Sequence, residues 1–327
     1  MNKLCNIYKS LLTGIFFLVS AAMFAQAETF NRAQQLYREK NTELAAQTID
    51  SVIVHPETMN DPLSWISRAF IYYELYKSHD KISSNLYKLE SRMRDTAIAS
   101  LKRSNALKPD ADYVEQNLKL LNTFAGHYYN IAGSLLQDSI NYSRSEFSYN
   151  KYKEYKRMSD PTFNFKQIDI EYYLAVGSVY SEIFTKDSKN VKAEEIAKTA
   201  LMKVLDLDPN NPSANINLGL MYYNQAANIS KEMSYDIDIS QIDIIQENMI
   251  KLAKQAEPFV LKVYTNDHNN ERAMTALYYI YRMLNDIPKS DEYKQRLKQK
   301  GVNVDDESKP AEENAPKEGT INDKNQK

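Results

Sequence analysis

One short segment, residues 197–223, constrains the fold more than any other part of the chain. Ala197, Leu201 and Val204 are spaced four and three residues apart, so they lie on one face of a helix. Asp208-Pro209 follows directly, and because the residue before a proline disfavours the helical conformation, we expect the helix to end there. The first half of the segment therefore predicts a helix with a defined end.

A second helix is predicted after the turn NNPS. Asn215, Leu218, Gly219 and Tyr222 again recur at helical spacing, and Gly219 falls in the middle of the face that they form. A residue without a side chain at that position allows a neighbouring helix to approach closely. The whole segment therefore reads as helix, proline-containing turn and helix.

This pattern resembles the junction between two tetratricopeptide repeats, and the resemblance extends over roughly residues 28–300. It implies an all-α fold, an α-solenoid of antiparallel helix pairs wound into a right-handed superhelix. The residues that match the small contact positions of the family are Ala45, Ala69, Ala97, Gly177, Ala197, Gly219 and Ala256. The Tyr-Tyr pairs that begin at residues 72, 128, 172, 222 and 278 lie farther apart than the family's unit of roughly 34 residues, so the repeats are lengthened.

The match to the family pattern is incomplete in the first half of the chain. Arg68 stands where the family has an apolar residue, which puts the packing there in question. In the next long helix, either Gly126 or Gly133 is the contact glycine, and the spacing does not choose between them. The polar segment SHDKISSN, residues 78–85, marks an insertion that we expect to lengthen two helices.

The first 27 residues have the pattern of a secretory signal peptide. Lysines precede a short apolar run, residues 11–24, and Ala25-Gln26-Ala27 is a small-x-small cleavage site. We expect cleavage before Glu28, which gives an exported protein, periplasmic or secreted, without a membrane span; the alternative is an uncleaved membrane anchor. Cys5, the one cysteine, would leave with the signal, so no disulfide or thiolate site is expected.

The remaining chain divides into a predicted repeat domain, residues 28–300, and a predicted disordered polar tail, residues 301–327, which holds two prolines and no aromatic residue. The chain has 41 basic and 43 acidic residues, and the basic residues form no stripe. A nucleic-acid partner is therefore not expected.

Motifs of the common enzyme classes are missing from the sequence, including HExxH, a P-loop and G-x-S-x-G. The four histidines are far apart in the sequence, and we expect capping or surface roles for them: His55, His79, His127 and His268. The sequence therefore predicts no catalytic residue, no cofactor and no metal site, and a protein that is not an enzyme.

Most of the 24 tyrosines recur at helical spacing and should be core residues. The resemblance places a further set of side chains in a concave groove lined by the first helix of each pair: Ile66, Phe70, Tyr73, Ile216, Leu220, Tyr223, Asn224, Tyr279 and Arg282. An apolar, aromatic groove suits an extended peptide or a partner helix. The open alternative is that the inserted turns cover the groove and bury these residues.

A second surface is suggested by residues 142–157, where tyrosines alternate with lysines and arginines. One interpretation is binding of an anionic glycan or lipid headgroup, and the other is a solvated helix face above buried tyrosines. The leading hypothesis for the whole chain is a non-catalytic periplasmic scaffold for a protein or peptide partner. The alternative is a binding module for a cell-wall glycan or another envelope ligand.

Overall fold

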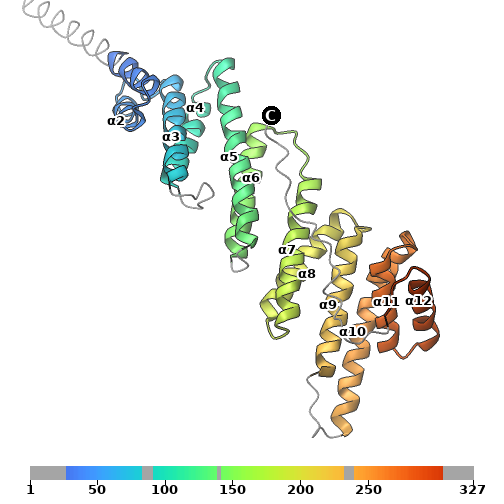
Figure 1. Ribbon diagram of the computed structural model, residues 1–327. Helices are drawn as coiled ribbons and strands as arrows, with labels where there is room; N and C mark the ends of the chain where they lie inside the picture. The colour runs from blue at the N-terminus through green and yellow to red at the C-terminus, as the bar shows by residue number, and fades with distance from the viewer. Residues whose placement is uncertain (1–26, 83–90, 138–140, 232–238, 305–327) are drawn as a thin grey trace, which may run out of the picture. The chain divides into compact units, whose positions relative to one another are not determined.

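The computed structural model describes residues 27–82, 91–137, 141–231 and 239–304, and all regular structure within these ranges is helical (Figure 1). The predicted signal peptide lies outside the described residues except for Ala27, and the predicted tail lies outside them from residue 305 onward. The chain divides into two compact units, residues 1–163 (unit 1) and 164–327 (unit 2).

The described part of unit 1 begins with a helical segment, residues 27–38, that precedes two helix pairs. Its helices are α2 (Thr42–Val52), α3 (Pro62–Ile82), α4 (Arg92–Ala106), α5 (Ala111–Gln137) and α6 (Tyr142–Ser159). α3 packs against α4 and α5 packs against α6, and α3 also contacts α5. An apolar core at the start of the unit joins the first segment, α2 and α3 through residues such as Leu36, Ile49 and Ile71.

Residues 164–231 and 239–304 of unit 2 form three helix pairs in succession. They are α7 (Lys166–Lys186) with α8 (Val191–Leu207), α9 (Pro212–Lys231) with α10 (Ile239–Asn266), and α11 (Glu271–Met283) with α12 (Ile287–Gln299). The first helices contact one another in order, α7 with α9 and α9 with α11. The expectation of an all-α fold built from successive antiparallel helix pairs is confirmed.

Three of the turns between helices in unit 2 share one sequence pattern, Asp-x-x-Asn. In the turn after α8, the Asp208 carboxylate accepts a hydrogen bond from the Asn210 N–H at 3.2 Å, and the Asn211 side chain caps α9 by accepting from the Ala214 N–H at 3.1 Å. The turns that begin at Asp187 and Asp267 repeat both contacts. Because an asparagine N-cap satisfies a free N–H of the first helical turn, the pattern ends one helix and begins the next. His268 therefore replaces proline in the last of these turns without changing it.

Close helix contacts in unit 2 occur at glycine. A Cβ atom on Gly219 of α9 would overlap the Val260 side chain of α10 and lie 3.2 Å from the Ala256 carbonyl oxygen. A Cβ atom on Gly177 of α7 would lie 2.5 Å from Leu201 Cδ2 of α8. These two residues and the five predicted contact alanines are all buried.

The long helix α5 makes its close contact at a different position. A Cβ atom on Gly126 would meet nothing within 4 Å, so Gly126 is not the contact glycine. The buried Ala132 lies at the approach of α6, where the Ser145 hydroxyl donates a hydrogen bond to the Ala132 carbonyl oxygen at 2.8 Å. The neighbouring Gly133 is half-buried.

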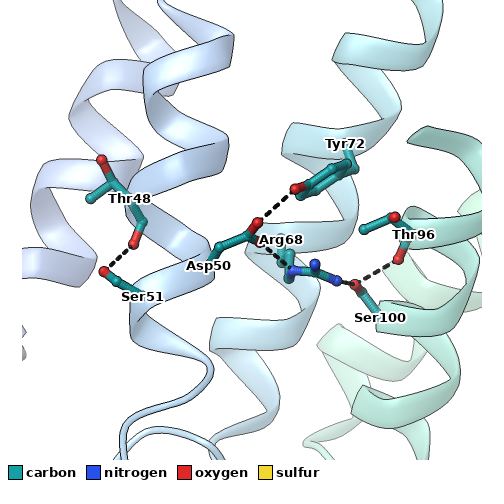
Figure 2. Close-up of polar contacts among 7 residues, drawn as sticks. All are labelled: Thr48, Asp50, Ser51, Arg68, Tyr72, Thr96 and Ser100. Atoms are coloured by element: carbon teal, nitrogen blue, oxygen red, sulfur yellow. Dashed lines mark hydrogen bonds and ion pairs between the residues drawn. The ribbon is translucent and has the colours of Figure 1, made fainter. Parts of the chain in front are cut away.

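A polar network joins α2, α3 and α4 at the position where the family pattern has an apolar residue (Figure 2). Arg68 Nε donates to Asp50 Oδ1 at 2.7 Å, and its Nη1 donates to Ser100 Oγ at 2.8 Å. The Tyr72 hydroxyl donates to the other Asp50 oxygen at 2.7 Å, and the Arg68 Cζ atom lies 4.7 Å from the centre of the Tyr72 ring. Three helices are therefore joined here by hydrogen bonds to one guanidinium group, which explains the departure at Arg68.

Candidate functional site

The predicted groove residues fall into both units. Ile66, Phe70 and Tyr73 lie on α3 in unit 1, and the remaining six lie on α9 and α11 in unit 2. Ile66 is only 3% exposed and Ile216 only 2% exposed. Both side chains belong to the core, because packing against neighbouring helices leaves them no surface for a partner. This corrects the expectation that these two residues line a groove.

Five of the predicted residues come together on the adjacent helices α9 and α11, and we call this surface the α9–α11 face: Leu220, Tyr223, Asn224, Tyr279 and Arg282. The centres of the Tyr223 and Tyr279 rings are 6.1 Å apart. Both rings are partly exposed and pack on the core of unit 2. Burial, followed by the nearby Tyr279, raises the pKa of Tyr223, so the hydroxyl is neutral at physiological pH. The exposed Arg282 donates from Nη1 to the Tyr278 hydroxyl at 2.8 Å.

A row of polar side chains runs across the first helices of unit 2, beside this face. Asn217 Nδ2 on α9 donates to Ser178 Oγ on α7 at 3.2 Å, and Arg272 Nη2 on α11 donates to Asn217 Oδ1 at 3.5 Å. Burial lowers the pKa of Arg272, although its guanidinium group stays charged. These polar residues were not predicted from the sequence. Their spacing is a usable signal, because Asn217 precedes Leu220 by three residues on the same face of the helix.

The two remaining groove residues in unit 1, Phe70 and Tyr73, are half-buried. The Tyr73 ring packs edge-on against Phe124 of α5, with 5.4 Å between ring centres and an interplanar angle of 82°. The Lys77 ammonium group lies 4.6 Å from the centre of the Tyr73 ring. Tyr73 therefore connects α3 to α5 as well as presenting part of its ring to solvent.

His127 lies in the middle of α5 among aromatic rings, so the expected capping or surface role is wrong for this histidine. Its ring centre is 5.5 Å from that of Tyr76, 6.1 Å from that of Phe124 and 6.4 Å from that of Tyr73. Burial, together with the positive charge of Arg94, lowers the pKa of His127 to about 4. The histidine is therefore neutral at physiological pH and packs as an aromatic side chain.

The tyrosines of α6 are mostly core residues. Tyr149, Tyr152 and Tyr155 are buried and Tyr142 is half-buried, whereas the basic residues between them reach the surface. This arrangement agrees with the interpretation of a solvated face above buried tyrosines. One part of the helix, however, borders a concave site.

This site is a cleft of about 510 Å³ where α4, α5 and α6 meet in unit 1, which we call the α4–α5–α6 cleft. Its wall is formed by these residues: Asp95, Ile98, Ala99, Lys102, Tyr128, Phe147, Lys151 and Tyr155. Ile98, Tyr128 and Tyr155 are buried and form an apolar floor, whereas Phe147 is 50% exposed at the rim. Burial raises the pKa values of Tyr128 and Tyr155 to about 12, so both hydroxyls are neutral.

Two lysines meet at one carboxylate beside this cleft. Lys102 Nζ lies 2.6 Å from Glu154 Oε1, and Lys151 Nζ lies 2.8 Å from Glu154 Oε2. Burial raises the pKa of the Glu154 carboxyl, but the hydrogen bonds from the two lysines outweigh this effect and lower the pKa. Both ammonium groups also lie near the Tyr155 ring, at 4.9 Å and 5.7 Å from its centre. Glu154 is therefore ionised and holds two cations at the mouth of the cleft.

The described part of the chain lacks two features that other kinds of site require. Within it, no three His, Cys, Asp or Glu residues gather closely enough to hold a metal ion. No helix of the described ranges has the length and apolar character that crossing a membrane requires.

The fold defines a class, that of all-helical repeat proteins built from successive helix pairs. No protein-family model and no curated protein matches the sequence. Among solved structures, the chain is similar to the crystal structure of PilW, a widely conserved type IV pilus biogenesis factor, with 16% sequence identity. That match covers 84% of this chain and 93% of PilW, with a TM-score of 0.34.

Proposed function

We propose that this protein is a non-catalytic, exported scaffold that binds a segment of a protein partner on the α9–α11 face. The observation that carries the proposal is the pairing of Tyr223 and Tyr279, whose partly exposed rings lie 6.1 Å apart on adjacent helices. Tyrosine and arginine are the residues that most often dominate binding energy at protein interfaces. Here two tyrosines stand beside the exposed Arg282.

The chemistry of the face indicates the kind of segment that it binds. Leu220 and the two tyrosine rings offer apolar area, and Asn224 offers an amide for hydrogen bonding. The positive charge of Arg282 acts on Tyr223, and the guanidinium group of Arg272 contacts Asn217 Oδ1 on the same two helices. An extended segment with apolar side chains and at least one carboxylate is complementary to this combination.

Export is supported by the sequence at the start of the chain. An apolar run of this length that ends at Ala25-Gln26-Ala27 is typical of a cleaved signal. We therefore propose that the scaffold is exported and is either periplasmic or secreted. The intact mass of protein purified from the native host tests this placement, because cleavage before Glu28 predicts a mass that starts at that residue.

Site-specific photo-crosslinking tests the binding proposal. A photoreactive phenylalanine analogue replaces Tyr223 or Tyr279 in the full chain, in its native host, and Met202 on α8 serves as the control position because it is exposed and lies elsewhere in unit 2. We expect one protein adduct at both tyrosine positions and none at Met202. Equal labelling at all three positions contradicts the proposal. A saccharide adduct without a protein adduct instead favours the glycan-binding alternative.

A further inference from the structure

The α4–α5–α6 cleft lies in unit 1 and plays no part in the binding proposed for the α9–α11 face. Its floor is apolar and its rim carries an exposed aromatic ring, Phe147, which lies 5.8 Å from the Lys151 ammonium group. A volume of about 510 Å³ is within the range of sites that hold a small ligand or a few side chains. The cleft is too small for a folded domain.

Two of the three helices that border the cleft, α4 and α6, concentrate positive charge. α4 and α6 together carry nine basic and three acidic residues, whereas the whole chain is nearly balanced, with 41 basic and 43 acidic residues. Inside the wall, the fully buried guanidinium group of Arg94 lies 4.4 Å from the centre of the Tyr128 ring and 3.5 Å from Asp95 Oδ1. The buried charge of Arg94 thus balances the negative charge of Asp95. The electrostatic potential at the mouth of the cleft is therefore set mainly by the lysines.

Glu154 shows what these lysines bind. Its two oxygens accept from Lys102 and Lys151, so one carboxylate bridges two ammonium groups and leaves one positive charge uncompensated. The three side chains are each between 30% and 39% exposed, so water and solutes reach them. A second carboxylate from a ligand can therefore join or displace Glu154 at the same two donors.

We propose that the α4–α5–α6 cleft binds an acidic peptide segment of a protein partner, with one large apolar side chain on the floor and neighbouring carboxylates on Lys102 and Lys151. This surface is separate from the α9–α11 face and does not depend on it. The apolar floor and the exposed Phe147 ring explain why a purely charged ligand is a poor match. The concave shape of the site favours a protruding side chain over a flat lipid surface.

The test uses a fluorescein-labelled peptide in which one phenylalanine lies among glutamates, added to the full chain at low salt and followed by fluorescence anisotropy. Two control peptides replace the phenylalanine by serine or the glutamates by glutamine. We expect the first peptide to bind at least about fivefold more tightly than either control, because floor and lysines both contribute. An excess of the same peptide without the label should displace the labelled peptide.

Substitutions locate the binding. The double change Lys102→Gln and Lys151→Gln should weaken binding by about tenfold or more, and Phe147→Ala by about fivefold. Lys119→Gln is the matched control, since Lys119 is an exposed lysine of α5 that pairs with Glu115 and does not line the cleft. Glu154→Gln should tighten binding severalfold, because it removes the carboxylate that already occupies both lysines. A merely structural role for these residues predicts no such gain.

Several results would overturn this proposal. One is equal affinity of the wild type for the phenylalanine and serine peptides, and another is a loss with Lys119→Gln as large as that of the double variant. Weaker binding after Glu154→Gln, with an unchanged thermal melt, also contradicts it. The protein is also tested for sedimentation with anionic phospholipid vesicles and for tight binding of polygalacturonate. If either binding occurs and the peptide does not compete with it, the surface belongs to a lipid or a glycan. None of these outcomes bears on photo-crosslinking at Tyr223.

Discussion

At the scale of single residues, burial decides the charge of His127. Its pKa in the folded protein is about 4, below the ordinary value of 6.5 that it regains on unfolding. Between these pH values the unfolded chain binds a proton that the folded chain does not. The contribution of His127 to the free energy of unfolding is therefore fully present above about pH 6.5 and is lost as the pH falls toward 4. We expect His127 alone to contribute a loss of up to about 3 kcal/mol, measured by urea unfolding across this pH range.

Two variants separate this effect from the general acid sensitivity of carboxylates. His127→Phe keeps an aromatic ring among Tyr73, Tyr76 and Phe124 and removes the titrating group, so its stability should depend less on pH than that of the wild type. His55→Gln is the control at a turn near the surface and should follow the wild type. Parallel pH curves for wild type and His127→Phe would show that the histidine does not titrate as inferred.

Arg68 is a residue at which local chemistry departs from the repeat pattern. Arg68→Leu restores the apolar type that the family has, but it removes one donor from Asp50 and one from Ser100 in a partly buried network (Figure 2). We expect a loss of about 1–3 kcal/mol in the free energy of unfolding. Arg296→Leu, which breaks an exposed pair with Glu292 on α12, should leave the free energy of unfolding close to the wild-type value. If Arg68→Leu changes the free energy of unfolding no more than Arg296→Leu does, or stabilises the protein, apolar packing can replace the hydrogen bonds of Arg68.

At the scale of helices, the two glycines Gly219 and Gly126 differ in what surrounds them. Gly219→Leu places a side chain where Val260 and the Ala256 carbonyl already lie, and should cost on the order of 1–3 kcal/mol or more. Gly126→Ala meets open space within a helix, and should stabilise by about 0.5–1 kcal/mol because alanine has the higher helix propensity. Thermal melts followed by circular dichroism measure both. An unchanged melt of Gly219→Leu would remove Gly219 from the contact.

The sequence allowed the helices of unit 2 to be predicted better than those of unit 1. The segment around Pro209 shows helix end, turn and helix start in adjacent residues, and the turn at Asp267 repeats the same contacts. Local signals of this kind depend only on neighbouring residues. In unit 1, by contrast, the choice between Gly126 and Gly133 depended on how α5 meets α6, which sequence spacing does not contain.

Candidate site residues were harder to predict, because exposure depends on tertiary packing. The resemblance to the repeat family placed Tyr223 and Tyr279 in one groove, and the structure brings their rings together. The same reasoning put Ile216 in the groove, although it is buried in the core. The α4–α5–α6 cleft is formed by three helices and by two lysines that share Glu154. It could not be predicted from sequence spacing, because Lys102 lies 52 residues from that glutamate in the chain.

At the scale of the whole molecule, one apolar cluster in unit 1 includes Ile49 and Ile71, and another in unit 2 includes Val260 and Leu277. In a repeat array each element is stabilised chiefly by its neighbours, so local unfolding of one unit need not unfold the other. We expect Gly219→Leu to speed amide hydrogen exchange in α9 and α10 by tenfold or more, at about 1.4 kcal/mol per tenfold, and to leave α3 and α4 unchanged.

Arg68→Leu provides the reciprocal measurement, because it perturbs α2, α3 and α4 within unit 1. Exchange should then increase in those helices and stay at the wild-type rate in α9, α10 and α11. Mass spectrometry of peptides from each helix resolves the two patterns in one experiment on the full chain. If either substitution raises exchange equally in both units, the molecule unfolds as one cooperative body. The division into two compact units would then describe geometry and not stability.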